Sequence, residues 1–523
     1  MSLTKSRRIA LLVIAAVLGA LAFLPVIHHY QLKAAVSRYR AELKAKGEPM
    51  ELKEVIPPPL SPAENSLELF LRAIALWNTN RTALDSNPPP LMRMVAPGKA
   101  MVAWAQPDVR KSGEDGATNS WDEMQTAVDQ DRAAIGLLHE LIAHPKLDFY
   151  IAYERGFADQ TFFTNLHLIQ LKKSALLLSS VAIVDLHNHR PDAAVQHVRT
   201  MLVLGDALRD QRTEISELVR LAIVSAAHSS TWEMLQSDQV TDAQLVSLQN
   251  DWERQEFVQS YEAAVTTERL VGDNMLKQWR SSNAELKKCV GVGNAVLEAL
   301  GQGNPDPPTF FQEVKFSTQI FMWRYWWSYT DELRVLQGHE ALVESARYAN
   351  TNGAFVAAYE RQQVRLGELG IAQLTGAMER LFQPGPPDLH SVLSASVVTL
   401  GNGFKKTYTA EAMKRLTVTA IALKRFQLKQ GRYPAQLSGL EPEFLVRVPR
   451  DPADGNPLRY RLNSDGTFLL YSIGEDGKDD GGDEKSAEEK FQRWRSGRDL
   501  VWPQPATDDE VRAWRESKSG KSE

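Results

Sequence analysis

Apolar residues at helical spacing dominate the middle of the chain. Over residues 161–283 they recur every three or four positions, which places them on one face of each helix in a series. The first of these faces contains Leu166, Ile169, Leu171, Leu176, Leu177 and Val181. Short joints separate the segments, as at residues 187–191, where a proline takes the first position of the next helix. The pattern predicts a stack of helical hairpins, similar to a solenoid but without a strict repeat.

Capping boxes mark the starts of three helices. In each box a Ser or Thr is followed three residues later by Glu or Gln, so that two free backbone N–H groups are satisfied. The boxes begin at Ser61, Ser120 and Thr241. The first helix is expected to reach Trp77 and the second about Ala143.

Three segments interrupt the helical pattern. Residues 79–119 are rich in Pro, Gly and Asn, and this composition predicts a long connection with little regular structure. Residues 281–310 combine Gly and Pro, and residues 384–387 read Pro-Gly-Pro-Pro, so each is expected to form a joint. Between these two joints, the pattern predicts further helices over residues 332–381.

An aromatic cluster follows the joint at residues 281–310. Its members are Phe316, Phe321, Trp323, Tyr325, Trp326, Trp327 and Tyr329. Because aromatic residues at consecutive positions cover every face of a helix, some of them could lie at a protein interface or a membrane surface. Large aromatic area drives burial, however, and this favours a core position between packed helices.

The N-terminus has the pattern of a membrane anchor. Lys5, Arg7 and Arg8 precede an uncharged apolar run over residues 9–27, which is long enough to cross a bilayer as a helix. The positive charge predicts that the N-terminus lies in the cytoplasm and that most of the chain lies on the opposite side of the membrane. A cleavable signal peptide is the alternative, since Ala20-Leu-Ala22 resembles a cleavage site. The apolar run continues beyond that site, which favours the uncleaved anchor, and both interpretations export the chain.

The pattern changes near the C-terminus. Apolar positions predict a long helix over residues 409–430, ending at Gly431, a residue suited to a left-handed C-cap. Two strands are expected at residues 458–462 and 467–473, and the Asp-Gly pair between them is a hairpin signal. The second strand enters a loop, residues 474–483, that contains four Asp and four Gly. The sequence therefore predicts a small α+β module that delivers carboxylates to one place.

Three motifs in this module carry a family resemblance. They are the Gly-Arg-Tyr-Pro turn at 431–434, the Asp-Pro-x-x-Gly-x-Pro-x-x-Tyr strand at 451–460, and the Ser-Ile-Gly-Glu-Asp-Gly segment at 472–477. Over about residues 409–502 they resemble the C-terminal half of the major pseudopilin (G-type) of type II secretion. The whole chain also looks like large, uncharacterised membrane-anchored proteins of planctomycete and verrucomicrobial type. A long helical region separates the N-terminal segment from the module, so the resemblance implies a fold and an ion site more than a place in a filament.

The resemblance implies one structural calcium ion in the final loop. Carried over by position, Asp476 takes the place of the first loop carboxylate, Asp483 that of a later one, and the carbonyl of Ile473 faces the ion. Asp480 is a further candidate ligand on its spacing alone. Oxygen ligands suit calcium, although the spacing is not that of an EF-hand. The alternative is a series of solvated Asp-Gly turns.

Composition and charge exclude some classes of function. The net charge of −5 is spread along a chain that is 43% hydrophobic and 24% charged, so no basic excess indicates a nucleic-acid partner. Cys289 is the only cysteine, which excludes an intrachain disulfide and a thiolate metal cluster.

The histidines do not form a recognised metal motif. His139 and His144 are five positions apart, whereas the zinc-protease motif requires four. A second group lies at a predicted helix end, where a structural role is favoured: Asp185, His187, His189 and His197. No phosphate loop, dinucleotide motif or nucleophile elbow occurs in a strand-to-helix context, so the sequence favours a non-enzymatic role.

Together these features predict a mainly α-helical protein in five parts. They are a cytoplasmic tip and transmembrane anchor (1–30), a helical stalk and Pro-rich linker (31–60), a solenoid-like helical domain (61–404), the pseudopilin-like α+β module (405–510) and a disordered tail (511–523). The expected function is scaffolding or protein interaction in the cell envelope, with a link to type II secretion or pilus-like systems. The expected location is the inner membrane, by a single span, with protein partners and the bulk of the chain periplasmic. The alternative is an envelope hydrolase or peptidase-like enzyme that uses a groove of the helical domain.

Overall fold

The computed structural model describes residues 26–77, 82–86, 88–89, 92–110, 118–158, 166–288, 310–374, 393–482 and 499–519. Nearly all of the predicted anchor lies outside the described residues, and so do the joint at 384–387, Cys289 and Asp483.

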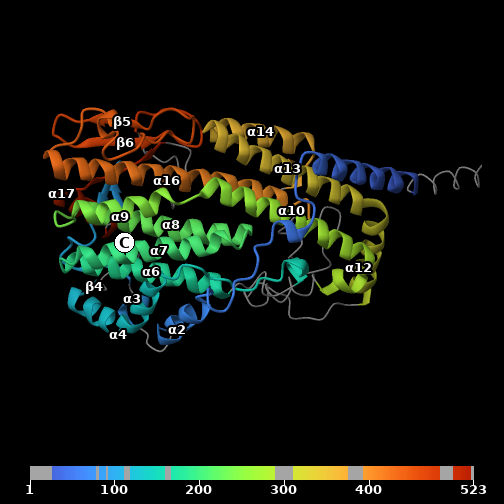
Figure 1. Cartoon of the computed structure of the whole chain (residues 1–523), viewed down its shortest axis with the longest axis horizontal. Helices are drawn as coiled ribbons and strands as arrows, with labels where there is room; N and C mark the ends of the chain where they lie inside the picture. Colours follow the sequence, from blue (N-terminus) through green and yellow to red (C-terminus); the bar gives the residue numbers. More distant parts are fainter. Residues whose placement is uncertain are drawn as a thin grey trace, which may run out of the picture.

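The described chain is mainly α-helical with two three-stranded sheets, as the sequence predicts for its class (Figure 1). A helix over residues 26–45 comes first. The labelled helices are α2 (Leu67–Trp77), α3 (Ala83–Ser86), α4 (Trp121–Glu140), α6 (Leu166–His187), α7 (Pro191–Arg209), α8 (Glu214–Leu235), α9 (Asp242–Glu253), α10 (Phe257–Ser281), α12 (Phe310–Met322), α13 (Ser328–Asn352), α14 (Phe355–Glu368), α16 (Ser396–Gln430) and α17 (Asp508–Ser519). Shorter helical turns are η1 (Leu52–Glu54), η2 (Tyr153–Ala158), the π-helical η3 (Trp323–Trp327), η4 (Ala372–Leu374) and η6 (Leu437–Leu440).

The helices lie side by side in layers (Figure 1). From one edge of the molecule to the other the order is α2 with α4, then α6, α7, α8 and α16, and finally the sheet that contains β5 and β6. Consecutive helices from α6 to α8 pack against each other, which agrees with the hairpin pattern. The long helix α16 packs on α8, α9, α10 and α13, so it joins this stack to the α10–α13 pair at the other end.

The C-terminal part of the chain contributes strands to two small sheets. One is β5 (Arg459–Leu462), β6 (Phe468–Ser472) and β7 (Leu500–Val501), all antiparallel, with the Asp-Gly turn between β5 and β6 as predicted. The other joins β1 (Arg93–Ala96), β2 (Lys99–Met101) and β8 (Gln504–Pro505), with β2 and β8 parallel. A separate pair is β3 (Val109–Arg110) with β4 (Thr118–Asn119).

Two of the three predicted capping boxes are confirmed. The side chains of Ser120 and Thr241 each accept a hydrogen bond from the third residue of their helix. The start predicted at Ser61 is wrong, because α2 begins at Leu67. The Ser61 hydroxyl donates to a nearby glutamate instead, and the side chain of Asn65 accepts from the Leu67 N–H at 3.1 Å.

Two segments expected to be irregular are tied to each other. Residues 79–119 contain β1 and β2, and residues 511–523, expected as a disordered tail, are mostly in helix α17. The Lys99 Nζ lies 2.6 Å from a Glu510 carboxylate oxygen, and the Arg93 guanidinium lies 5.4 Å from the centroid of the Trp514 ring. β1 and β2 are only four and three residues long, and they lie among the Pro, Gly and Asn residues that predicted a connection, so the pattern missed them.

The predicted boundary between helical domain and module, at residue 405, falls inside α16. Buried residues of α16 belong to the same hydrophobic cluster as Phe70 of α2 and Trp502 after β7. The C-terminal sheet and the helical stack therefore share one core.

The expected stalk is docked on the body rather than free. In the helix over residues 26–45, Val36 and Leu43 are buried and pack with Leu336 of α13. Arg40 of the same helix forms ion pairs with Asp273 of α10 and Glu332 of α13. Both carboxylates are buried, so these contacts hold the helix in one position on the α10–α13 pair.

One helix among the described residues, His167–His187, is long and apolar enough to cross a bilayer. It is 67% buried inside the protein, and core helices pass the same test of length and composition.

A pair of carboxyl groups lies between α8 and α10, with Glu268 buried and Glu214 half-buried. The backbone N–H of Glu214 donates to the Glu268 carboxyl group at 3.2 Å. Burial, reinforced by Glu268, raises the pKa of Glu214 to about 8, and Lys406 opposes that shift. Burial also raises the pKa of Glu268 to about 7, against the hydrogen bond from Glu214.

These pKa values predict a stability that falls as pH rises. Both exceed the ordinary value of 4.5, so between that pH and about 8 the folded chain binds more protons than the unfolded chain. Glu268→Gln is therefore expected to raise the free energy of unfolding at about pH 8, by up to about 3 kcal/mol, and to remove most of its decline between pH 4.5 and about 7. Denaturant titrations at several pH values measure both effects. The control is Glu360→Gln on the exposed face of α14. If the unfolding free energy changes with pH equally in both variants, the raised pKa of Glu268 is contradicted.

Candidate cation site and adjoining pocket

The buried carboxylate of Asp451 organises the C-terminal sheet. It accepts hydrogen bonds from Ser472 Oγ (2.6 Å), Ile473 N (2.8 Å), Ala453 N (2.9 Å) and Arg459 Nη1 (3.1 Å). Burial raises the pKa of Asp451, while these hydrogen bonds and the Arg459 charge oppose the shift. One side chain thus joins the Asp-Pro turn before β5 to the end of β6, where the Asp-Gly loop begins.

The carbonyl of Ile473, predicted as a calcium ligand, faces helix α16. It accepts hydrogen bonds from the hydroxyl of Tyr408 and, at 3.1 Å, from Ser472 Oγ. The Tyr408 hydroxyl also lies 3.2 Å from Ser472 Oγ. These bonds fix the start of the loop on α16 and occupy the carbonyl in the core.

The carboxylates of the loop are held by its own backbone. Asp476 accepts from the Lys478 N–H at 3.1 Å, so it caps its own turn. Asp479 accepts from the Gly481 N–H at 3.0 Å and from the Tyr471 hydroxyl at 2.9 Å. The Gly481 hydrogen bond, with further donors that include Arg459, lowers the pKa of Asp479 despite some burial.

Asp499, at the start of the closing strand, has one unsatisfied oxygen. The residue is only 4% exposed, and its Oδ2 accepts from the Gly482 N–H at 2.7 Å. Its Oδ1 has no hydrogen-bond partner among the described residues. Burial, with the nearby charges of Asp479 and Asp480, raises the pKa of Asp499. The backbone N–H groups of Gly482 and Asp480 oppose this shift. A buried carboxylate oxygen beside two other carboxylates is an arrangement that a bound cation would satisfy.

The donor set fits calcium in part. Asp480 lies close enough to Asp499 for its charge to raise the pKa of Asp499, and Asp476 keeps one oxygen that its turn does not use. The described residues do not form a complete site, since no group of three or more His, Cys, Asp or Glu side chains among them is arranged to hold a metal. The sequence did not indicate Asp499 as a candidate ligand, because it lies outside the acidic loop along the chain.

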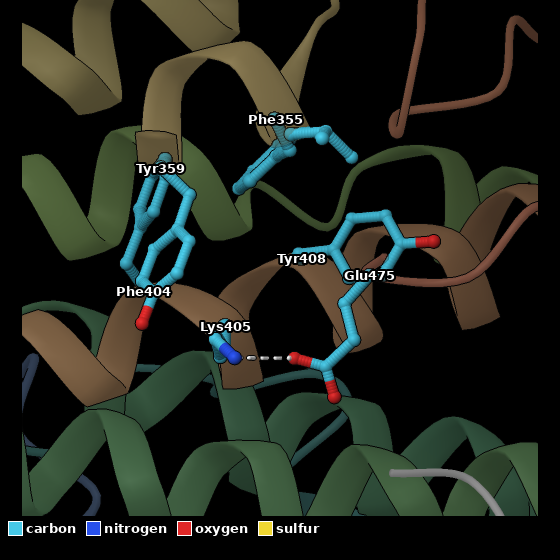
Figure 2. Close-up of a pocket in the computed structure, with 7 residues that line it drawn as sticks. Phe355, Tyr359, Phe404, Lys405, Tyr408 and Glu475 are labelled. Atoms are coloured by element: carbon cyan, nitrogen blue, oxygen red, sulfur yellow. Dashed lines mark ion pairs between the residues drawn. The ribbon is translucent and has the colours of Figure 1, made fainter. Parts of the chain in front are cut away.

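A small pocket adjoins the start of the loop at Glu475 (Figure 2). It is lined by Phe355, Val356 and Tyr359 of α14, by Phe404, Lys405 and Tyr408 of α16, and by Glu475. The Lys405 Nζ lies 3.3 Å from the Glu475 carboxylate and 4.7 Å from the centroid of the Tyr359 ring. Its free space of about 20 Å³ is about that of one water molecule, so the pocket serves the packing of the loop rather than a substrate.

The histidine group in the helical stack comes together only in part. The His197 Nε2 lies 2.8 Å from the Asp185 carboxylate, and its Nδ1 lies 2.9 Å from the His139 Nε2. Burial is the main cause that lowers the pKa of His139 to about 4, and the charge of His197 is the second. His187 instead stacks on Trp121, with ring centroids 4.0 Å apart. The resulting chain of side chains joins α4, α6 and α7.

The fold and the site define the chain as a mainly α-helical protein with an acidic loop at the edge of a small antiparallel sheet. Comparison with family models, curated proteins and solved structures finds no match.

Proposed function

We propose that the protein is a single-pass, membrane-anchored scaffold of the bacterial cell envelope, whose body lies outside the cytoplasm. The observation that carries this proposal is the docking of the helix over residues 26–45. This helix follows directly on the apolar run at residues 9–27, and Arg40 and Leu43 hold it on α10 and α13. A body fixed to its anchor in this way would present its surfaces at a set height and orientation above the membrane.

The role that best suits such a body is protein interaction. A stack of consecutive helices offers a broad side surface, as in solenoid-like proteins. The long helix α16 followed by the antiparallel β5–β6–β7 sheet supports the proposed likeness to the pseudopilin C-terminal half. We include in the proposal a link to type II secretion or pilus-like systems.

An envelope hydrolase is the second candidate. The observation in its favour is the raised pKa of Glu214 and Glu268, since carboxyl groups of this kind serve as general acids. In the structure, however, Glu268 accepts from the backbone at the start of α8, which favours a structural role.

Protease accessibility in a bacterial host tests the proposed topology. Protease added after the outer membrane is permeabilised is expected to digest the body of the full chain, and a cytoplasmic marker protein should stay intact. Protection of the body until the inner membrane is broken would contradict the proposal. The purified full chain is also expected to show no turnover of generic peptide, ester and phosphoester substrates. Turnover lost in Glu268→Gln but kept in Glu360→Gln would establish the hydrolase.

We further propose that the loop over residues 474–482, together with Asp499, binds calcium as a structural ion. Asp480 and Asp499 would hold it, and the ion would neutralise the repulsion between these two carboxylates. Asp476 would turn toward the ion as it binds, because the described residues hold no ready group of three acidic side chains for a metal. Ile473 is omitted because its carbonyl is bonded to Tyr408. The bound ion would favour the folded loop over the unfolded chain.

Calcium is therefore expected to raise the melting temperature of the full chain. At a concentration one hundred times its Kd the stabilisation would be about 2.7 kcal/mol. Asp499→Asn should abolish the increase and Asp476→Ala should reduce it, whereas Asp465→Asn in the exposed hairpin turn should leave it intact. Terbium luminescence sensitised by Tyr471, which contacts Asp479, gives a second readout. Identical melting in calcium and in chelator would contradict the proposal.

A further inference from the structure

Helix α12 has two apolar faces, and only one of them packs on the body. Ile320 and the following Trp323 are buried in a cluster with Trp279 of α10. The other face is open, with exposed fractions of 73% at Phe310, 81% at Phe311, 48% at Val314, 53% at Phe321 and 48% at Tyr325. Exposed aromatic side chains grouped on one helix face mark an interaction surface.

This open face carries no charge. At 3.6 residues per turn, Ser317 and Thr318 lie among its apolar residues, and the Thr318 hydroxyl is bonded to the Val314 carbonyl at 2.9 Å. Glu313 and Lys315 lie at the two borders of the face. Arg324 lies on the Glu313 border, and its guanidinium turns to the body, where it donates to the Trp279 carbonyl at 3.0 Å. A helix with apolar residues on an uncharged face and charges only at its borders has the pattern of an interfacial membrane helix.

The open face lies beside the point where the N-terminal segment leaves the body. The His29 Nδ1 is 3.0 Å from the Tyr325 carbonyl oxygen, and its ring centroid is 5.0 Å from that of Tyr329. Ile27 and Tyr30 are exposed in the same region. Figure 1 shows α12 and the start of the N-terminal helix at the same end of the molecule.

We propose that the open face formed by Phe310, Phe311, Val314 and Phe321 of α12 and by Tyr325 of η3 inserts into the interfacial layer of the membrane next to the anchor. The proposal rests on the proposed anchoring by residues 9–27. Because that anchor would enter the bilayer within a few residues of His29, it would hold α12 at the lipid surface and make the second contact effectively intramolecular. Phenylalanine would enter the acyl boundary, while tyrosine and tryptophan suit the headgroup level. A second copy of the chain could also cover such a face. The membrane is favoured because the neighbouring N-terminal segment would itself enter it.

Depth-dependent quenching in vesicles tests this proposal with the full chain. In a Cys289→Ser background, Phe311→Cys is labelled with an environment-sensitive fluorophore and reconstituted into vesicles of phosphatidylcholine and phosphatidylglycerol. The matched control is Val446→Cys, on a loop residue that is 95% exposed. Lipids with a nitroxide near the headgroup are expected to reduce the Phe311 signal about twofold or more, and to leave the Val446 signal unchanged.

The outcomes separate this proposal from the anchoring on which it rests. Alkaline extraction of the same vesicles reports the anchor independently. If the chain resists extraction and the Phe311 probe is not quenched by lipid, the anchor stands and the proposal fails. If that probe is instead shielded from aqueous iodide without lipid quenching, a protein covers the face, and the proposal also fails. If the chain is extracted and the probe is not quenched, anchoring and insertion fail together.

Discussion

Replacing Asp451 with alanine is expected to lower the free energy of unfolding by about 3–5 kcal/mol. The substitution removes four hydrogen bonds at once and leaves the backbone N–H of the buried Ile473 without its acceptor, while the half-buried Arg459 keeps Asp454 and Asp479 as partners. The end of β6 and the Asp-Gly loop would then separate from the turn before β5. Because the sheet shares its core with α16, the loss should appear in the unfolding of the whole body.

Chemical denaturation of the full chain measures this effect, and Asp465→Ala is the matched control. Asp465 also accepts two hydrogen bonds, both from Thr467, but it lies on an exposed hairpin turn. Its replacement is expected to cost no more than about 1 kcal/mol. Equal destabilisation by the two substitutions would show that Asp451 does not organise the sheet.

Replacing Arg40 with alanine is the second change with a large expected effect. Arg40 pairs with Asp273 and Glu332, two buried carboxylates on different helices. Lys277 and Arg280 remain beside them, so the expected loss of stability is about 2–3 kcal/mol, below the range for an isolated buried pair. The loss should be concentrated in the helix over residues 26–45, which would leave the body without a fixed anchor.

Hydrogen exchange of residues 26–45 reports this undocking directly. Arg40→Ala is expected to speed exchange of these amides about tenfold or more, since each 1.4 kcal/mol of lost docking corresponds to a factor of ten. The control is Lys46→Ala, which removes only an exposed ion pair with Glu344. Unchanged protection in Arg40→Ala would mean that the ion pairs do not hold the helix in place.

The sequence predicted the helices far better than the parts that tie them together. Ser120 and Thr241 are local signals, because a cap acts within one turn, and Gly431 ends α16 in the expected left-handed conformation. The pairing of β2 with β8 has no local signal, since each strand is only two or three residues long and its partner is about four hundred residues away. The same holds for α17, whose charged sequence suggested a free tail.

In the candidate site, too, some residues have a local sequence signal and others depend on the tertiary fold. The resemblance singled out Asp476 and Ile473 by position, and Asp480 was predicted from its spacing in the acidic loop. The role of Asp451 depends on its burial beneath β6, and that of Asp499 on the return of the chain to β7, so both require the tertiary fold. The use of the Ile473 carbonyl by Tyr408 likewise depends on how α16 lies against the sheet.

The intact mass of the protein recovered from host membranes after alkaline extraction tests the central claim most directly. A membrane-anchored scaffold retains residues 9–27, so the account predicts a full-length chain of 58.6 kDa in the extracted membrane pellet. A chain that lacks the residues up to Ala22 and is recovered in the soluble fraction would contradict it, because the N-terminal segment would then be a cleaved signal peptide.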